Sequence, residues 1–297
     1  MKYAAVDFGT NSCRLLIAQI DAGRRLVPLH RGLNQSRLGQ GLIHSGKISE
    51  EAIKKTLNCL LEYTDLIQRA RVVACRAVAT SAVRDADNRD YFWETMTQHF
   101  PGVIDIIDGK EEACLTFRGV EHGLGLDLYP VVVDIGGGST EIISKQDNEI
   151  YIKSLPLGAV RASESNLSRE AMLKLLEDGL GDIKALRGHP LVMVGGTATS
   201  LAAMKMAIGE YKPELIHGQV LSFEEVSHLS QRLFSTDLEQ RKKILGLQPE
   251  RADILPQGSR IIELIMFILA AREMIVSESD LLEGVIWSLY YKNERSQ

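Results

Sequence analysis

The chain has 297 residues, of which 45% are hydrophobic and 25% are charged, and its formal net charge is −5. This length predicts two domains of ordinary size, and the apolar content excludes an intrinsically disordered chain. The acidic balance argues against a general DNA-coating protein or a basic membrane binder, although a local basic pocket for a polyanionic substrate is compatible with it.

In the first half of the chain, short apolar runs alternate with helical patterns. The clearest helix is expected over residues 49–70, where Ser49 is a suitable N-cap and Glu50 and Glu51 lie in the first turn. Strands that alternate with helices predict an α/β fold. The other expected elements are strands at residues 4–7, 15–18, 72–79 and 103–107 and helices at residues 87–100 and 110–120.

The second half repeats this alternation and then becomes more helical. The longest uninterrupted apolar run, residues 264–271, has eight residues, which is too short for a membrane span of about 18 and predicts a buried helix. The expected strands are residues 131–134, 141–143, 149–155 and 191–194, and the expected helices are residues 167–186, 222–234, 256–274 and 279–291, with another starting at Ala198.

A short motif occurs twice in the chain. Residues 6–12 read VDFGTNS, and 127 positions later residues 133–140 read VDIGGGST. Each copy lies between two apolar runs, which is the pattern of a strand, a glycine-rich hairpin turn and a second strand. The repeat predicts two related domains, 1–123 and 124–297, divided in the glycine-rich stretch 123–127. The last helix is a segment that could pack back on the first domain.

The glycine-rich turns are candidate phosphate sites. Glycine lets a phosphate approach the main chain, and consecutive N–H groups can converge on an oxyanion. Asp134 and Glu141 flank the second turn and could hold Mg²⁺ or a water molecule. The alternative is a pair of hairpins in which the glycines only allow the backbone to turn and bind no ligand. A third Gly-Gly-Thr turn at residues 195–197 favours the phosphate interpretation.

Two further segments carry groups suited to phosphate chemistry. Residues 79–85 (ATSAVRD) end a strand with two hydroxyls and Arg84, whose planar fork matches phosphate oxygens. The alternative there is a helix N-cap with a surface arginine. Glu111 and Glu112 begin a helix, where the helix dipole alone favours acids. The functional alternative is that one of them activates a water molecule as a general base.

Other chemistries lack their motifs. Residues 41–47 match G-x-x-x-x-G-K, but Ile48 stands where a nucleotide-binding loop needs Ser or Thr, and no strand pattern precedes it. The four cysteines and seven histidines form no zinc or metalloprotease pattern, and the sequence has no G-x-S-x-G elbow. Widely spaced cysteines indicate reduced thiols and a cytoplasmic location.

Seven segments occur in the order found in one enzyme family. They are residues 6–12, 79–84, 109–113, 133–141, 155–161, 195–197 and 251–258. Together they resemble the short, two-domain form of the exopolyphosphatase/guanosine pentaphosphate phosphohydrolase family over nearly the whole chain. The resemblance implies two ribonuclease-H-like α/β domains of the actin, heat-shock ATPase and sugar-kinase superfamily, with the site in an interdomain cleft.

The resemblance also implies hydrolysis of a terminal phosphoanhydride. Glu112 matches the family's catalytic glutamate. Glu141 and Asp134 match acids that position water and a divalent cation, Mg²⁺ or Mn²⁺, and Asp7 could contact the metal through water. The groups that would bind phosphate are Asn11, Ser12, Arg84, Gly136, Gly137, Gly138 and Ser139.

The sequence departs from the family pattern in two ways. Family members often carry three acids where this chain has Lys110, Glu111 and Glu112, so the local charge here is less negative. Long members also carry a C-terminal helical extension that this chain lacks. The second departure suggests a preference for short polyphosphate or for the nucleotide.

Two other functions stay open at this point. One is a kinase or ATPase of the same superfamily, which needs an adenosine pocket. The other is a non-catalytic sensor that binds polyphosphate or an alarmone nucleotide, although the intact acids argue against it. The residues do not discriminate polyphosphate from guanosine pentaphosphate as the substrate. Neither DNA nor a membrane is an expected partner, and the superfamily suggests a homodimer.

Overall fold

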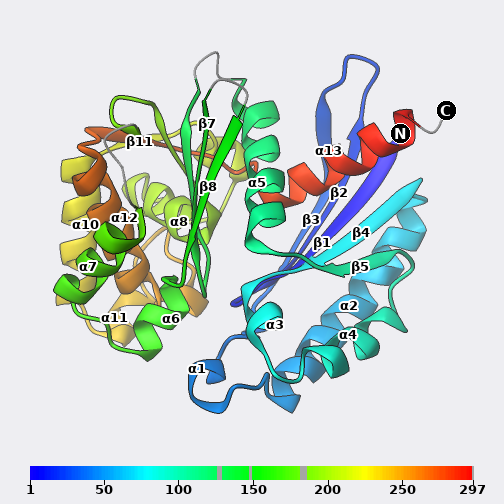
Figure 1. Cartoon of the computed structure of the whole chain (residues 1–297), viewed down its shortest axis with the longest axis horizontal. Helices are drawn as coiled ribbons and strands as arrows, with labels where there is room; N and C mark the ends of the chain where they lie inside the picture. Colours follow the sequence, from blue (N-terminus) through cyan, green and yellow to red (C-terminus); the bar gives the residue numbers. More distant parts are fainter. Residues whose placement is uncertain (126–128, 147–148, 181–185, 296–297) are drawn as a thin grey trace. The chain divides into compact units, whose positions relative to one another are not determined.

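The computed structural model describes residues 1–125, 129–146, 149–180 and 186–295 (Figure 1). The chain forms two compact units. Unit 1 consists of Met1–Gly119 and Asp280–Gln297, and unit 2 consists of Val120–Ser279. Each unit has one mixed sheet with helices packed against it.

Unit 1 is built on a five-stranded sheet in the order β3-β2-β1-β4-β5. The first three strands run antiparallel, whereas β4 is parallel to β1 and β5 to β4. Its strands are β1 (Lys2–Phe8), β2 (Cys13–Ile20), β3 (Leu26–Asn34), β4 (Ala74–Ala79) and β5 (Val103–Ile106). Its helices are α1 (Leu42–Ser45), α2 (Glu50–Ala70), α3 (Ser81–Asp85), α4 (Arg89–Thr97) and α13 (Leu281–Glu294), and α5 (Gly109–Leu124) starts in this unit and ends in unit 2.

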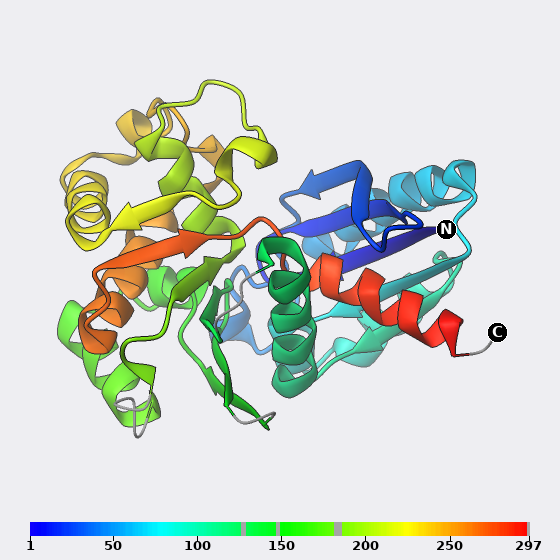
Figure 2. The same cartoon turned by 90° about the horizontal axis from the view of Figure 1, so that it is seen from above.

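The central strand of unit 1 is buried on both faces. Successive side chains of a strand point to opposite faces of the sheet. Val6 and Phe8 therefore pack in the cluster that includes α2 and α4, whereas Tyr3 and Ala5 pack in the cluster that includes α13. Figure 2 shows α13 in red across the strands of this unit. A strand covered on both sides explains why β1 is an almost continuous apolar run.

Unit 2 is built on a six-stranded sheet in the order β10-β11-β9-β6-β7-β8. Its core surrounds α12, which is apolar on most of its surface. The strands are β6 (Val131–Ile135), β7 (Thr140–Gln146), β8 (Glu149–Leu155), β9 (Leu191–Val194), β10 (Val220–Ser222) and β11 (Glu273–Val276). The helices are α6 (Ala159–Glu164), α7 (Arg169–Leu180), α8 (Gly195–Lys205), α9 (Pro213–Ile216), α10 (Phe223–Ser235), α11 (Leu238–Arg241), the 3-10 helix η2 (Pro249–Arg251) and α12 (Leu255–Leu269).

The two sheets share one topology. In unit 1 an antiparallel meander β1-β2-β3 is extended by parallel strands β4 and β5, and in unit 2 the meander β6-β7-β8 is extended by parallel strands β9 and β11. The repeated sequence motif occupies the first hairpin turn of each meander. The predicted fold class, two related ribonuclease-H-like α/β units, is confirmed.

The final helix belongs to unit 1, although it follows the whole of unit 2 in sequence. Against the predicted ranges 1–123 and 124–297, the structure changes unit after Gly119 and returns to unit 1 at Asp280. The helix is held there because its apolar side chains are buried against β1, β2 and β4. Of the predicted glycine-rich joint, Leu126 and Asp127 lie outside the described residues.

The apolar segment near the C-terminus forms a helix and then a strand. α12 ends at Leu269, and Ala270 adopts a left-handed conformation with φ of 53°. β11 follows at Glu273–Val276 and pairs with β9. The expected helix 256–274 is therefore too long, because a buried helix and a buried strand share the same apolar composition. Among the described residues, no helix is both long and apolar enough to cross a membrane.

We predict that the Trp287→Ala substitution destabilises unit 1. Trp287 is 3% exposed and contacts the ring of Tyr290, which in turn contacts Tyr3 of β1. Truncation of a buried aromatic side chain costs about 3–5 kcal/mol. Urea unfolding followed by circular dichroism measures the loss, with exposed Lys292→Ala as the control. Equal stabilities of the two variants would contradict the packing of α13 on this sheet.

Candidate active-site groups

Both glycine turns are closed by the same hydrogen bond. In unit 1 the N–H of Gly9 donates to the carbonyl of Ser12, and in unit 2 the N–H of Gly136 donates to the carbonyl of Ser139, each at 3.0 Å. In each turn the closing bond spans the same three positions. The two copies of the motif are therefore equivalent in structure as well as in sequence.

The glycine turn of unit 2 presents main-chain donors on one side. The carbonyls of Gly136 and Gly137 accept hydrogen bonds from the N–H groups of Ala159 and Val160 in α6, at 2.9 Å each. In a trans peptide the next N–H points away from the carbonyl, and the described chain contains no cis peptide. No described residue accepts a hydrogen bond from the N–H of Gly137, Gly138 or Ser139. Such a row of unpaired N–H groups is suited to an oxyanion.

Two carboxylates face each other at the base of this turn. Asp134 of β6 lies directly opposite Glu141 of β7, so both side chains are on the same face of the sheet. Glu141 is 1% exposed, and its Oε1 accepts a hydrogen bond from Ser154 Oγ at 2.8 Å. Gly195 begins α8 beside Asp134: a Cβ there would lie 2.9 Å from Asp134 Oδ1.

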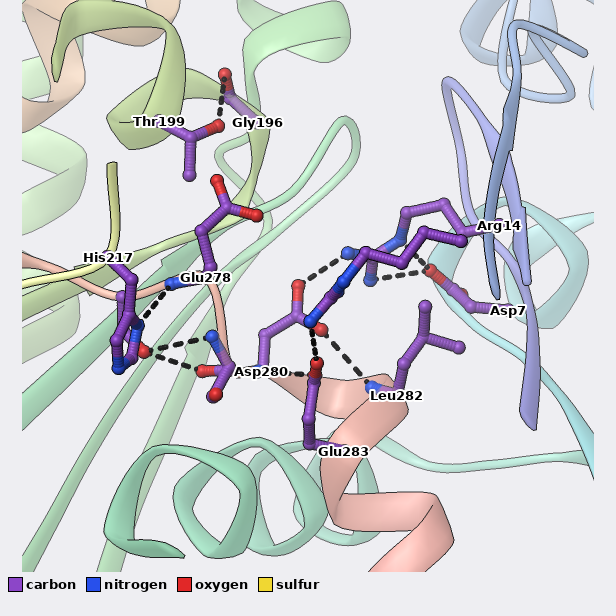
Figure 3. Close-up of polar contacts among 12 residues, drawn as sticks. Asp7, Arg14, Gly196, Thr199, His217, Glu278, Asp280, Leu282 and Glu283 are labelled. Atoms are coloured by element: carbon purple, nitrogen blue, oxygen red, sulfur yellow. Dashed lines mark hydrogen bonds and ion pairs between the residues drawn. The ribbon is translucent and has the colours of Figure 1, made fainter. Parts of the chain in front are cut away.

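The equivalent pair in unit 1 consists of one acid and one base. Asp7 of β1 lies opposite Arg14 of β2, and Asp7 Oδ2 accepts hydrogen bonds from Arg14 Nε at 2.9 Å and Nη2 at 2.8 Å. Arg14 also pairs with Asp280, the N-cap of α13 (Figure 3). Arg14 therefore joins the first hairpin to the last helix. Unit 2 has two acids at the positions where unit 1 has one acid and one arginine.

Burial governs the titration of Asp7. Its side chain is 6% exposed, and removal from water raises the pKa of its carboxyl above 3.8, although Arg14 acts in the opposite direction. Asp7 Oδ1 is buried and has no hydrogen-bond partner among the described residues. An unpaired carboxylate oxygen can accept a hydrogen bond from a water molecule, which is compatible with the predicted indirect contact with a metal.

The two acids that begin α5 have different surroundings. Glu111 is half-exposed, and its Oε1 pairs with Arg76 at 2.6 Å. Glu112 is 7% exposed, and its Oε2 lies 3.1 Å from Arg84 Nη1. The same Arg84 Nη1 donates to the carbonyl of Ile107 at 3.0 Å, which fixes the guanidinium. The helix dipole accounts for Glu111 at the surface, whereas Glu112 is a buried acid held by an arginine.

The remaining predicted phosphate groups lie in the turn of unit 1. Asn11 donates through its side-chain amide to Gln35 Oε1 at 2.7 Å. The N–H groups of Asn11 and Ser12 donate no hydrogen bond to any described residue. Unit 1 thus carries a second, shorter row of main-chain donors. The structure brings Asn11 and Ser12 together in one turn and Arg84 and Glu112 together at the start of α5.

The third glycine turn has a different environment. Gly196 is covered by Arg251, since a Cβ on Gly196 would lie 1.1 Å from Arg251 Nη1. Nearby in unit 2, the hydroxyl of Tyr211 donates to Glu278. The N–H of Glu278 donates to His217 Nδ1 at 3.1 Å (Figure 3). An arginine side chain therefore lies against this turn, which distinguishes it from the two hairpin turns.

The donor set of unit 2 fits Mg²⁺ better than zinc. Asp134 and Glu141 supply hard carboxylate oxygens on one face of the sheet. In the part of the chain that the structure describes, no group of three or more His, Cys, Asp or Glu side chains is arranged to bind a metal. Zinc sites need three or four protein ligands, whereas Mg²⁺ commonly binds one or two carboxylates and keeps waters or substrate phosphates.

The sequence alone did not identify Arg14, Asp280 or Gly158 as parts of these groups. Asp280 lies 266 residues from Arg14, and only the packing of α13 brings them together. Arg14 is a charged residue in an otherwise apolar strand, which is a usable signal of a buried ion pair. Gly158 was part of a matched segment without a role, and its position against Gly137 is a tertiary contact.

The duplicated units and their glycine turns place the protein in the ribonuclease-H-like class of α/β folds. Residues 16–293 match the model of the Ppx/GppA phosphatase family, and the chain belongs to this family.

Individual relatives agree with this assignment. The chain is 34% identical to exopolyphosphatase 2 of Mycobacterium tuberculosis over 313 residues, which cover 97% of this chain and 98% of that protein. It is 33% identical to the bifunctional 3-dehydroquinate synthase/phosphatase of Fusobacterium nucleatum over 95% of this chain, but only 46% of that longer protein.

Solved structures show the same architecture. The Ppx/GppA family member of Aquifex aeolicus has a TM-score of 0.83 and 29% identity, with 99% of this chain and 98% of that chain covered. An exopolyphosphatase from Cytophaga hutchinsonii has a TM-score of 0.87 and 28% identity, with 97% of each chain covered.

We predict that Arg14→Met destabilises unit 1 by about 3–5 kcal/mol at pH 7, because it leaves Asp7 and Asp280 buried without their shared cation. A buried carboxyl with a raised pKa is more stable when protonated, so its favourable contribution is present at low pH and is lost as pH rises. The loss is therefore expected to be smaller at about pH 5, as urea unfolding at both pH values can measure.

The matched control for Arg14→Met is Arg25→Met, which removes an exposed pair with Asp21. Addition of Asp7→Asn to Arg14→Met is expected to restore part of the stability, because one of the two uncompensated charges is removed. A destabilisation that does not change between the two pH values would contradict the role of the buried charges.

Proposed function

We propose that this protein hydrolyses the terminal phosphoanhydride bond of inorganic polyphosphate and releases orthophosphate. The observation that carries the proposal is the turn at residues 136–139, whose three N–H groups have no acceptor among the described residues and point away from α6. The family and the relative named exopolyphosphatase 2 support the same chemistry. Main-chain donors fixed in advance stabilise charge in a phosphoryl-transfer transition state without reorganisation.

Glu112 is the general base in this proposal. It accepts the proton of a water molecule whose oxygen attacks the terminal phosphorus, while the bridging P–O bond breaks and the shortened chain leaves with the electron pair. Arg84 Nη1 lies 3.1 Å from Glu112 Oε2 and fixes the position of the carboxylate that would act as the base. A direct contact between Arg84 and phosphate stays a prediction.

Asp134 and Glu141 hold a divalent cation in this proposal, either Mg²⁺ or Mn²⁺. When bound, the cation offsets the negative charge of the phosphate oxygens. Ser154 orients Glu141 through the hydrogen bond to Oε1, so one carboxylate is preset for the cation. Asp7 contributes Oδ1, its second oxygen, to an ordered water, because Arg14 already occupies Oδ2.

The proposal includes guanosine pentaphosphate as a second substrate. Its terminal phosphate is joined by the same kind of anhydride bond, so the same base and main-chain donors would act on it. Phosphate release from short polyphosphate, long polyphosphate and the nucleotide, measured in parallel with purified protein, determines the preference. Absence of release from all three substrates, with magnesium present, would contradict the proposed function.

We predict that Glu112→Gln lowers kcat by about 10²–10⁴-fold, the usual contribution of a general base, while the protein stays folded. The matched control is Glu111→Gln, which alters the neighbouring acid of the same helix turn but changes only a half-exposed ion pair. The control is expected to retain kcat within about twofold. Steady-state phosphate release measures both, and equal losses in the two variants would refute the assignment of Glu112.

We predict that chelation with EDTA abolishes phosphate release and that added Mg²⁺ or Mn²⁺ restores it. Asp134→Asn is expected to raise the metal concentration for half-maximal rate by about 10–100-fold, because a neutral amide is a weaker ligand than a carboxylate. Asp178→Asn, on an exposed part of α7, is the control. Activity that persists in EDTA would exclude the cation from the mechanism.

A further inference from the structure

A segment that follows the third strand of each meander holds the glycine turn by binding its main-chain carbonyls. In unit 1 this segment includes Arg37 and Gly39, whose N–H groups donate to the carbonyls of Asn11 at 2.9 Å and Thr10 at 2.8 Å. A side chain at Gly39 would collide with Thr10, because a Cβ there would lie 2.2 Å from Thr10 Cγ2. The segment therefore packs closely on the turn.

The segment of unit 2 makes the corresponding contacts. The N–H of Val160 donates to the carbonyl of Gly137 at 2.9 Å. Gly158 approaches the turn so closely that a Cβ there would lie 2.4 Å from the same carbonyl oxygen. Leu157 and Gly158 come shortly after β8, and Leu38 and Gly39 come after β3 at a somewhat longer interval. The duplication thus extends beyond the hairpin to a Leu-Gly pair that packs on it.

One contact differs in chemistry between the units. Gly9 and Gly136 donate the hydrogen bonds that close the two turns. When these glycines are aligned, Asn11 corresponds to Gly138. The carbonyl of Asn11 is held by the main-chain N–H of Arg37, whereas the carbonyl of Gly138 is held by a side chain, Arg161 Nε, at 2.8 Å. An arginine side chain in unit 2 therefore does what the main chain does in unit 1.

The anchored carbonyl belongs to the peptide that carries the N–H of Ser139. Since the peptide is trans, the direction of that N–H is set by the direction of the Gly138 carbonyl. Gly138 has no Cβ to restrict its own backbone, so an external contact is needed to select one conformation. Loss of the anchor would let this peptide rotate and would cost the oxyanion one oriented donor.

We propose that Arg161 is a positioning residue that aims the Ser139 N–H at a bound phosphate by holding the Gly138 carbonyl, while Gly158 lets the supporting segment approach. The inference rests on the proposed role of residues 136–139 in phosphate binding. It adds a function for Arg161 and Gly158, which make no part of the base or the cation site. In this view both residues act on the substrate only through the turn.

The test measures the binding of tripolyphosphate by isothermal titration calorimetry with Mg²⁺ present. All proteins carry Glu112→Gln so that the ligand is not consumed, and the added changes are Arg161→Gln, Gly158→Ala and both together. Arg161→Gln is expected to raise Kd by about 10–100-fold, the loss of one hydrogen bond to a charged group. Gly158→Ala is expected to raise Kd by a similar factor. The Kd of the double variant is expected to be no higher than that of the single variant with the higher Kd.

The matched control is Arg187→Gln, which removes another arginine of unit 2 that binds a backbone carbonyl, that of Ile268, at 3.0 Å. It is expected to leave Kd unchanged. Unfolding temperatures of all variants exclude a loss of the fold, and Arg161→Lys, which keeps a donor and a charge, is expected to recover part of the affinity.

Two results would overturn the proposal. One is an unchanged Kd in Arg161→Gln. The other is a double variant whose loss is the product of the single losses, since Arg161 would then contact phosphate independently of the supporting segment. Continued hydrolysis by the Glu112→Gln protein would instead contradict the role of Glu112. The Arg161 and Gly158 variants would then be compared by their KM values in place of Kd.

Discussion

The planarity of the trans peptide is the constraint that sets the direction of the donors in the glycine turns of this fold. A carbonyl and the N–H of the next residue point in opposite directions, so a protein can aim donors at a ligand by binding the carbonyls behind them. In unit 2 the carbonyls of three successive residues, Gly136, Gly137 and Gly138, are bound on one side. The segment after the third strand of the meander supplies these contacts, and each unit contains such a meander and segment.

The two copies have diverged at one pair of facing positions. Arg14 neutralises Asp7 in unit 1, whereas Glu141 adds a second negative charge beside Asp134 in unit 2. A pair of acids on one face attracts a cation, and an acid paired with arginine does not need one. The exchange gives the two copies of the hairpin different charges. In unit 1 Arg14 fastens α13 through Asp280, whereas in unit 2 the two acids are the groups to which we assign the cation in the proposed mechanism.

The repeat at Asp7 and Asp134 was sufficient to predict two related α/β units, because strand, turn and strand patterns are local. The N-cap at Ser49 and the helix after it were also predicted correctly. β3 was not predicted because most of its side chains are exposed and it therefore lacks an apolar pattern. The start of α8 was expected at Ala198 but lies at Gly195, whose φ of 83° and contact with Asp134 depend on the sheet.

Less of the candidate site than of the fold could be predicted from the sequence. The residue types of Glu112, Arg84 and the glycine turn could be selected from their motifs, but nothing local separates Glu112 from Glu111. Their difference arises from Arg76 and Arg84, which approach from other elements. The supporting contacts of Gly158 and Arg161 were equally hidden, because they depend on which carbonyl lies opposite each donor. A sequence motif specifies which groups are present, and tertiary packing determines which of them are free to act.

Three of the arginines near these groups form ion pairs with carboxylates. Arg14 is shared by Asp7 and Asp280, Arg84 binds Glu112, and Arg76 binds Asp105 and Glu111. Each of these three guanidinium groups therefore cancels charge on the protein's own carboxylates, and it adds little positive potential for a polyanion. In the proposed mechanism, main-chain dipoles and a cation held by Asp134 and Glu141 supply most of the attraction for phosphate. An acidic chain could bind a polyanionic substrate in this way, because the orientation of a few peptide groups would matter more than the net charge.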